Sequence, residues 1–182
     1  FSGKKYFFDK DIYAKRVYDS KGEAHPEVNI QFGPNIKDWP KMEALSDDLL
    51  VKVVSEIHDP VTTTDELIPS GETSSFRSNP LGLAEFTLSR KDPDYVPRAK
   101  AVRDMSDEIR EEIKKCVEIF DAKYPDMKGR VASSGIGSTI YAVKPGDGSA
   151  REQAASCQRV LGASANIACE YATKRYRSNL IN

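Results

Sequence analysis

The chain is poor in the residues that build metal sites and disulfide frameworks. Its 182 residues include three cysteines, Cys116, Cys157 and Cys169, and two histidines, His25 and His58. An odd number of cysteines without CxxC spacing argues against a disulfide framework and favours a reduced, cytoplasmic location. Because thiol and imidazole ligands are so few, we expect no metal site built from this chain alone.

Long apolar runs are absent as well. No stretch approaches the roughly 18–20 apolar residues that a membrane helix needs. The polar first residues are not followed by the apolar segment of a secretory signal. We therefore expect no membrane partner for this chain.

The chain also lacks an excess of charge of either sign. Its 27 Lys and Arg residues are balanced by 28 Asp and Glu residues, and its isoelectric point is near 6.2. This balance argues against a strongly basic nucleic-acid footprint, so nucleic acid is not an expected partner. A single exposed patch of Lys174, Arg175 and Arg177 would favour nucleic-acid binding, but we interpret these residues as a solvated helix face.

The composition is that of an ordinary globular protein, with 39% hydrophobic and 30% charged residues. A chain of this length can bury one sizeable core, so we predict a single domain over residues 1–182. The chain begins at Phe1 and stops at Asn182, and we interpret both ends as cuts in a longer polypeptide.

The first half contains two strand patterns and a long loop. Residues 27–32 alternate apolar and polar side chains, which predicts a strand, and the β-branched run at residues 49–57 predicts a second, more buried one. Residues 59–80 are rich in Thr, Ser, Gly and Pro and are expected to form a loop with a functional role. A short helix is expected over residues 81–89.

One long amphipathic helix is predicted over residues 97–124. Steps of three and four residues link its apolar positions into one stripe, with charged residues opposite. A partner-binding helix would show this pattern, but packing on the chain's own sheet explains it as well, and we favour packing. Cys116 lies on the stripe and is expected to be part of the core.

The second half alternates strands and helices. Strands are predicted at residues 130–133, 139–143 and 165–169, with helices at 150–160 and from residue 171 onward. Strand and helix in succession imply a mostly parallel sheet flanked by helices, so the predicted fold class is α/β. Cys157 and Cys169 are expected to pack as small apolar side chains.

The turn before the predicted helix at 150–160 is the strongest candidate for a functional site. Gly146 and Gly148 permit a sharp turn and leave room for a ligand, and Ser149 then lies at the helix N-terminus, which favours an anion. Arg151 offers a planar fork to a carboxylate. Ser149 and Glu152 also have the spacing of a capping box, a purely structural alternative. The Walker pattern for phosphate is absent.

The segments around this turn resemble a known family. The string GDGSAREQA is similar to the GxGSSREHA segment of the last domain of aconitases and of the small subunit of isopropylmalate isomerases, and RVLGASANIACEYATKRYRSNL resembles the segment that follows it there. Thr63-Thr64-Asp65 and Ser75-Phe76-Arg77 resemble the family's Thr-Thr-Asp and Phe-Arg-Gly elements. The resemblance covers about residues 49–80 and 130–182.

The resemblance implies a swivelling β/β/α domain of the aconitase C-terminal type and a role for four residues. Ser149 would be the catalytic base of a hydro-lyase that dehydrates and hydrates a hydroxy-polycarboxylate such as citrate or isocitrate. Arg77 and Arg151 would bind substrate carboxylates, and Ala150 would line the substrate site where the family has a second serine. Gln153 stands where the family usually has histidine.

The resemblance also implies a cofactor and partners that lie outside this chain. A [4Fe-4S] cluster would be ligated by other domains of the same polypeptide, so none is expected in this fragment, which alone would be inactive. Two alternatives stay open. The chain could be a stand-alone small subunit of an isopropylmalate-isomerase-type dehydratase, or a binding module without catalysis.

Overall fold

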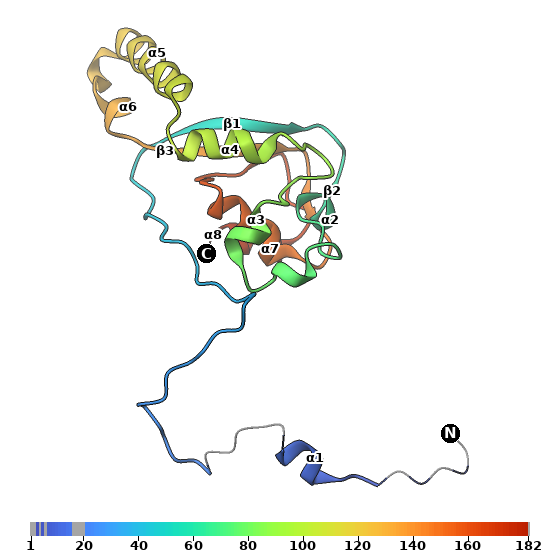
Figure 1. Ribbon diagram of the computed structural model, residues 1–182. Helices are drawn as coiled ribbons and strands as arrows, with labels where there is room; N and C mark the ends of the chain where they lie inside the picture. Colours follow the sequence, from blue (N-terminus) through green and yellow to red (C-terminus); the bar gives the residue numbers. More distant parts are fainter. Residues whose placement is uncertain (1–2, 4, 6, 16–20, 182) are drawn as a thin grey trace. The chain divides into compact units, whose positions relative to one another are not determined.

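The computed structural model describes residues 3, 5, 7–15 and 21–181. The chain divides into two compact units, Phe1–Gly33 and Pro34–Asn182. The first unit contains the short helix α1 (Lys10–Ala14). Every other helix and strand of the described residues lies in the second unit (Figure 1). The single domain over 1–182 stays a prediction.

The second unit alternates strands with helices, as the sequence pattern predicts for an α/β fold. In chain order, its elements are β1 (Leu49–Ile57), β2 (Thr62–Thr63), α2 (Thr64–Leu67), the 3₁₀ turn η1 (Ser74–Phe76), α3 (Pro80–Ala84), α4 (Tyr95–Arg103), α5 (Asp107–Lys123), the 3₁₀ turn η2 (Pro125–Met127), α6 (Arg130–Ser133), β3 (Gly135–Ala142), β4 (Pro145–Asp147), α7 (Arg151–Val160), β5 (Ile167–Ala168) and α8 (Lys174–Ile181).

Both sheets are parallel. The larger has the strand order β1-β3-β5, and the smaller consists of β2 and β4. In the larger sheet the register runs from Leu49 opposite Gly135 to Ile57 opposite Ala142, with an irregularity between Val53 and Ser55. The predicted class, α/β with a mostly parallel sheet flanked by helices, is confirmed.

The core lies between this sheet and its helices. Val54 and Ile57 of β1 and Ile140 and Ala142 of β3 are buried together. Helix α4 packs along β1 and β3 through side chains four and three residues apart, the spacing of one helix face (Figure 1). Those buried side chains are Tyr95, Ala99 and Val102.

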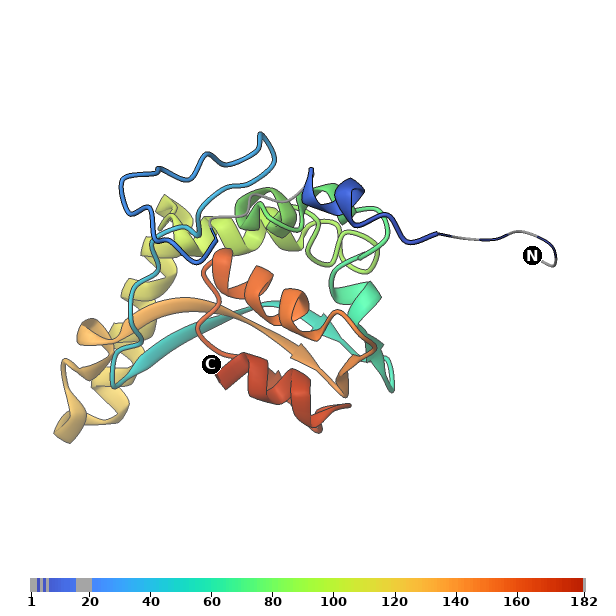
Figure 2. The same ribbon diagram turned by 90° about the horizontal axis from the view of Figure 1, so that it is seen from below.

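Helices α7 and α8 pack against each other and fix the turn between β3 and α7 (Figure 2). The buried Gln158 of α7 donates hydrogen bonds to the Tyr176 hydroxyl of α8 at 3.0 Å and to the Ala154 carbonyl at 2.8 Å. The Tyr176 ring lies under Gly146, where an added Cβ would come within 2.3 Å of it. Gly146 also has a φ of +96°, which favours glycine.

The predicted helix over residues 97–124 is wrong as one element, because it is broken into α4 and α5. Met105 has a φ of +54°, which ends the first helix, and Ser106 begins the second by accepting a hydrogen bond from the Ile109 N–H. Serine followed by two acidic residues is a helix-start pattern that the apolar stripe obscures. Within the described residues, no helix combines the length and apolarity that crossing a bilayer requires.

Two predicted strands are also wrong. Residues 27–32 form no strand, and Val28 and Ile30 are exposed, because no neighbouring strand within the described residues pairs with them. Residues 130–133 form helix α6 instead. The pairing of β1 with β3 begins at Leu49 and Gly135, so residues before Gly135 have no partner strand. The predicted strand at 139–143 begins earlier, at Gly135.

The other predicted elements are present, most of them with shifted ends. Residues 49–57 form β1, and the helix predicted at 150–160 forms α7. The strand predicted at 165–169 is shorter, and the closing helix begins at Lys174. The helix predicted over 81–89 is helical only to Ala84 before a series of turns, and the long loop at 59–80 contains β2, α2 and η1.

We expected all three cysteines to pack in the interior, and two of them do not. Cys157 is buried, as predicted, but Cys116 and Cys169 are exposed. Cys116 is exposed because α5, unlike α4, contributes only Ile109 to the buried core. Cys169 follows the short β5, and its thiol lies 3.3 Å from the Tyr141 hydroxyl.

We expect Gly146→Ala to lower the free energy of unfolding by about 2–4 kcal/mol, because the new methyl group both overlaps the Tyr176 ring and forces a left-handed residue. Urea unfolding followed by circular dichroism measures the loss. Gly129→Ala is the matched control, since Gly129 has a φ of +87° with open space around it. An equal loss in both variants would contradict the role of the Tyr176 contact.

The buried thiol should be distinguishable by reactivity. Burial raises the pKa of Cys157 to about 12, so it holds little thiolate at pH 8. We expect two of the three thiols to react rapidly with a disulfide reagent in the folded chain, and the third only after urea is added. Serine substitution of Cys157 should remove the slow phase alone, and three equally fast thiols would contradict the packing described above.

Candidate functional site

The two-stranded sheet brings the Thr-Thr-Asp motif beside the glycine turn. Thr62 lies opposite Pro145 and Thr63 opposite Asp147, and the Thr62 N–H donates to the Lys144 carbonyl at 3.0 Å. These segments are more than eighty residues apart in the chain. The pairing of β2 with β4 therefore joins two of the three segments that carry the family resemblance.

The glycine turn is clamped from both sides. Gly148 has a φ of +133°, and a Cβ there would lie 2.2 Å from the Thr64 hydroxyl oxygen. On the other side, Gly146 lies against Tyr176, and its carbonyl accepts a hydrogen bond from the Thr173 hydroxyl at 3.1 Å. This close packing fixes the direction in which the chain leaves the turn toward Ser149.

Ser149 does not cap helix α7. The helix begins at Arg151 with Ala150 as its N-cap, so the alternative of a capping box between Ser149 and Glu152 is not formed. With its amide oriented to suit its neighbours, Asn179 of α8 accepts the Glu152 backbone N–H at 2.9 Å instead. The exposed Ser149 hydroxyl has no hydrogen-bond partner among the described side chains and backbone groups.

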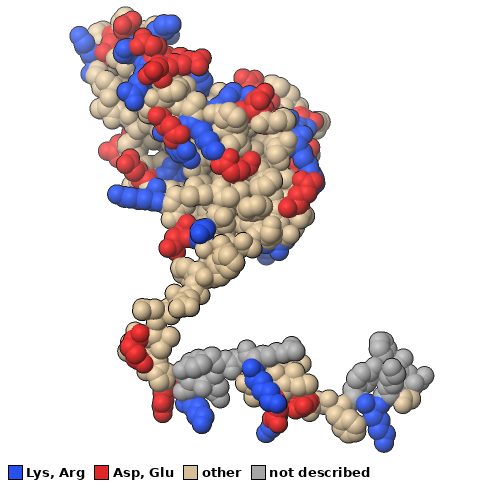
Figure 3. All heavy atoms as spheres, viewed as in Figure 1, with Lys and Arg blue, Asp and Glu red and all other residues tan. Residues whose placement is uncertain are grey.

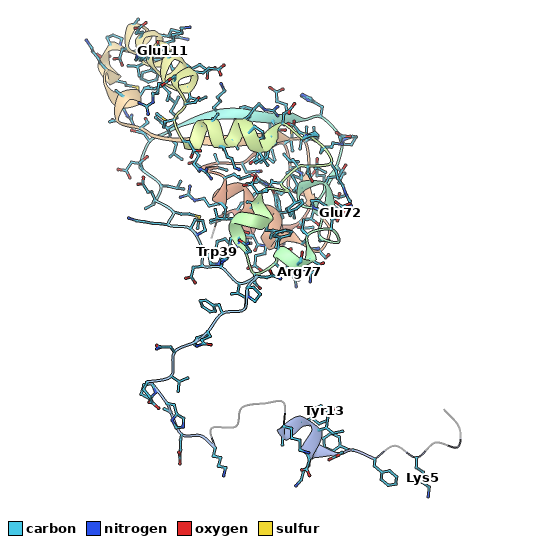
Figure 4. The ribbon with its side chains drawn as sticks, in the orientation of Figure 1. Lys5, Tyr13, Trp39, Glu72, Arg77 and Glu111 are labelled. Carbon is cyan, nitrogen blue, oxygen red and sulfur yellow. The ribbon has the colours of Figure 1, made fainter. Side chains whose placement is uncertain are left out.

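All four predicted site residues line one cavity of about 290 Å³. Ser149, Ala150 and Arg151 enter it from the start of α7, and Arg77 enters it from the end of η1. Trp39 closes another side, and Figure 4 shows where Trp39 and Arg77 lie. The structure therefore brings together residues from three separate segments, while their chemical roles stay a prediction.

Two arginines meet at this cavity without a carboxylate partner. Within the described part of the chain, neither Arg77 nor Arg151 forms an ion pair. The Arg151 Nε is buried and has no hydrogen-bond partner. Glu152 contributes one negative charge to the rim, so the two guanidinium groups leave a net positive cavity. Such a site favours an anion, and each planar guanidinium suits a carboxylate.

Asp65, the acidic residue of the Thr-Thr-Asp motif, does not line this cavity. Asp65 accepts a hydrogen bond from Arg90 at 2.6 Å, and Arg90 also pairs with Glu72 at 2.6 Å. These two carboxylates raise the pKa of Arg90 above its usual value. Asp65 therefore already has a cationic partner within the fold.

Thr63 also has a structural role, because it caps α2. Its hydroxyl accepts the Glu66 N–H at 3.2 Å, while the Glu66 carboxylate accepts the Thr63 N–H at 2.7 Å. Burial alone would raise the pKa of Glu66, but hydrogen bonds from Thr63 and Lys91 lower it below its usual value. This capping box holds Thr64 in position under Gly148.

The sequence patterns missed two residues of this region. Trp39 is the only tryptophan of the chain, but it lies in a segment without helix or strand periodicity. Asn179 belongs to the Asn-Leu pair of the family resemblance, yet nothing in its spacing predicts a bond to α7. Asn179 bonds to a distant segment, and Trp39, which is 57% exposed, lines the cavity beside residues far from it in the sequence.

Metal ligands do not gather in the described residues. No group of three His, Cys, Asp or Glu side chains within them is close enough to bind an ion. Cys157 lies in the core, whereas Cys116 is exposed on α5 and Cys169 is exposed beyond β5. The described residues therefore do not fit an iron–sulfur cluster.

Exposed basic residues occur on α8 and on the face shown in Figure 3. Lys174, Arg175 and Arg177 are all exposed on α8, with Tyr176 between them buried. On the face shown in Figure 3, Lys and Arg side chains are interspersed with Asp and Glu. Alternating charge of this kind is typical of a solvated surface.

Comparison of the chain with protein-family models finds no match, and none is found among curated proteins. The roles predicted for Arg77, Ser149, Ala150 and Arg151 therefore depend on the motifs of this sequence and on the geometry of the cavity that these residues share.

Proposed function

We propose that this chain is the swivelling C-terminal domain of an aconitase-like hydro-lyase, which reversibly removes water from a hydroxy-polycarboxylate such as citrate or isocitrate. The observation that carries the proposal is the single cavity lined by Ser149, Arg77 and Arg151, with both arginines free of carboxylate partners. Its partners would be the substrate and the remaining domains of the same polypeptide, in the cytoplasm.

The chemistry explains why these residue types belong together. Dehydration requires the loss of a proton from a carbon next to a carboxylate, which is a weak acid, so the base must be strong and nearby cations must stabilise the developing charge. A serine becomes such a base only as an alkoxide. Arg151, two residues from Ser149, supplies positive charge beside it, and Ser149 has no competing hydrogen bond.

Arg77 and Arg151 would hold the substrate while Ser149 acts on it. A planar guanidinium binds a carboxylate through two parallel hydrogen bonds, which fixes both its position and its orientation. Two such groups on different segments would bind two carboxylates of one substrate. Removal of the leaving hydroxyl is assigned to a cluster held elsewhere in the protein, and no step of it involves the cysteines of this chain.

Ala150 makes this cavity less polar than the family pattern. A serine at that position would donate one more hydrogen bond, and losing a donor in a buried carboxylate site costs about 1–3 kcal/mol. Ala150 and Gln153 both line the cavity. We therefore expect the preferred substrate to differ from that of enzymes with the Ser-Ser and His pattern.

The same cavity would serve a stand-alone small subunit of an isopropylmalate-isomerase type, which keeps the reaction class and changes the substrate. A module that only binds nucleic acid finds less support, because acidic and basic side chains are interspersed on the face shown in Figure 3 and the chain has a formal net charge of −1. The unpartnered arginines favour the hydro-lyase.

The chain should bind a tricarboxylate through Arg151. We expect tricarballylate to change the fluorescence of Trp39, the only tryptophan, and Arg151→Gln to weaken its binding about tenfold to a hundredfold, the loss of a charge-assisted hydrogen bond of about 1.5–3 kcal/mol. Arg175→Gln, at an exposed position outside the cavity, is the matched control. Equal weakening by both variants would show only a nonspecific charge effect.

Turnover tests the role of Ser149. In the whole protein with its cluster reconstituted, we expect Ser149→Ala to lower kcat for cis-aconitate hydration by at least about a hundredfold, the scale of general base catalysis, with little change in KM. Ser178→Ala, which removes an exposed hydroxyl on α8, should leave kcat unchanged. An unimpaired Ser149→Ala enzyme would refute the base assignment, and no turnover by any variant would refute the substrate assignment.

A further inference from the structure

A second, larger cavity lies next to the candidate site. It has a volume of about 500 Å³, within the range of small-molecule pockets. Trp39 and Ser156 line both cavities. The two cavities therefore share part of their lining.

The wall of the second cavity is mostly apolar. Met42 and Leu45 line it from the segment before β1, and Leu180 and Ile181 line it from the end of α8. Ile181 is 75% exposed, so it contributes an apolar surface that the fold itself does not bury. A hydrocarbon group placed here would remove this surface from water.

Arg159, the cationic side chain in the lining of this cavity, already donates hydrogen bonds to backbone carbonyls. Arg159 donates a hydrogen bond from Nη1 to the Ala163 carbonyl at 3.1 Å and a second from Nη2 to the Glu43 carbonyl. It therefore differs from Arg151, whose Nε has no partner. The carboxylates of a ligand belong with Arg77 and Arg151, and only its uncharged part belongs beside Arg159.

The rise of helix α7 gives the distance that a ligand bound at Arg151 must span to reach Ser156 and the second cavity. Ser156 follows Arg151 by five residues, and a rise of 1.5 Å per residue places it about 7.5 Å further along the helix. A hexyl chain covers this distance. A methyl group attached to the carboxylate-bearing carbon would stay in the first cavity.

We propose that the substrate is a hydroxy-polycarboxylate with a linear alkyl substituent, whose carboxylates bind Arg77 and Arg151 and whose alkyl chain passes Trp39 into the second cavity. The inference rests on the proposed function, since it uses the same carboxylate site. Trp39 and Ser156 are specificity-determining residues in this arrangement.

Trp39 fluorescence distinguishes the two parts of the ligand. Hexylsuccinate should bind at least about ten times more tightly than methylsuccinate, because each buried methylene strengthens binding by up to about fourfold. Ile181→Asn should abolish most of this difference and leave methylsuccinate binding unchanged. Ile119→Asn, the same exchange at a residue that is 67% exposed on α5, is the matched control and should keep the full difference.

The outcomes separate the two proposals. If both succinates bind equally and depend on Arg151, the alkyl pocket is refuted while the carboxylate site stands. If neither binds, or if Arg151→Gln changes nothing, the proposed function fails first. Heptanamide, which has the hexyl chain without the charges, should bind far more weakly than hexylsuccinate; equal binding would show a general apolar groove. A change in oligomeric state with Ile181→Asn, measured by sedimentation, would assign the surface to a second copy instead.

Discussion

The packing of the glycine turn between Thr64 and Tyr176 is the constraint on which the site depends. Neither Gly146 nor Gly148 has room for a side chain, so the turn has one way to pass between α2 and α8. Tyr176 is itself held by Gln158 of α7. The turn, α7 and α8 are therefore packed together as one assembly. This packing, and not local helix capping, positions Ser149 and Arg151.

The distribution of charge follows from the same assembly. Arg90, Arg98 and Arg130 each pair with a carboxylate near the sheet or its connecting loops. Arg77 and Arg151 line the same cavity as Ser149 and form no ion pair within the described residues. Asp65, the acidic residue of the Thr-Thr-Asp motif, pairs with Arg90. Among the described residues, other cations such as the exposed Arg175 also lack an ion pair, but the Arg151 Nε is buried without a hydrogen-bond partner, a local exception of the kind expected at a functional site.

The sequence predicted those elements whose patterns are local. The β-branched run of β1 and the amphipathic α7 carry their own periodicity, so both were found with nearly correct ends. Residues 27–32 and 130–133 have strand patterns too, but a strand exists only where a partner pairs with it. The gathering of Arg77, Ser149 and Arg151 depends on the pairing of β2 with β4, which is too short for any pattern to reveal. The motif resemblance placed these residues together, and it gave no indication of Trp39.

The position of Trp39 links recognition to the rest of the fold. Its segment is held from both ends: the Lys37 N–H donates to the Ser78 carbonyl beside Arg77, and the Ser46 hydroxyl accepts the Gly135 N–H at the start of β3. Between these two hydrogen bonds, Trp39, Met42 and Leu45 are exposed. A substrate that lacks an alkyl group would leave the apolar surface around Trp39 and Ile181 in water, whereas one that carries it would cover that surface. The burial of this surface, and not an additional polar contact, would then discriminate between substrates that share the same carboxylates.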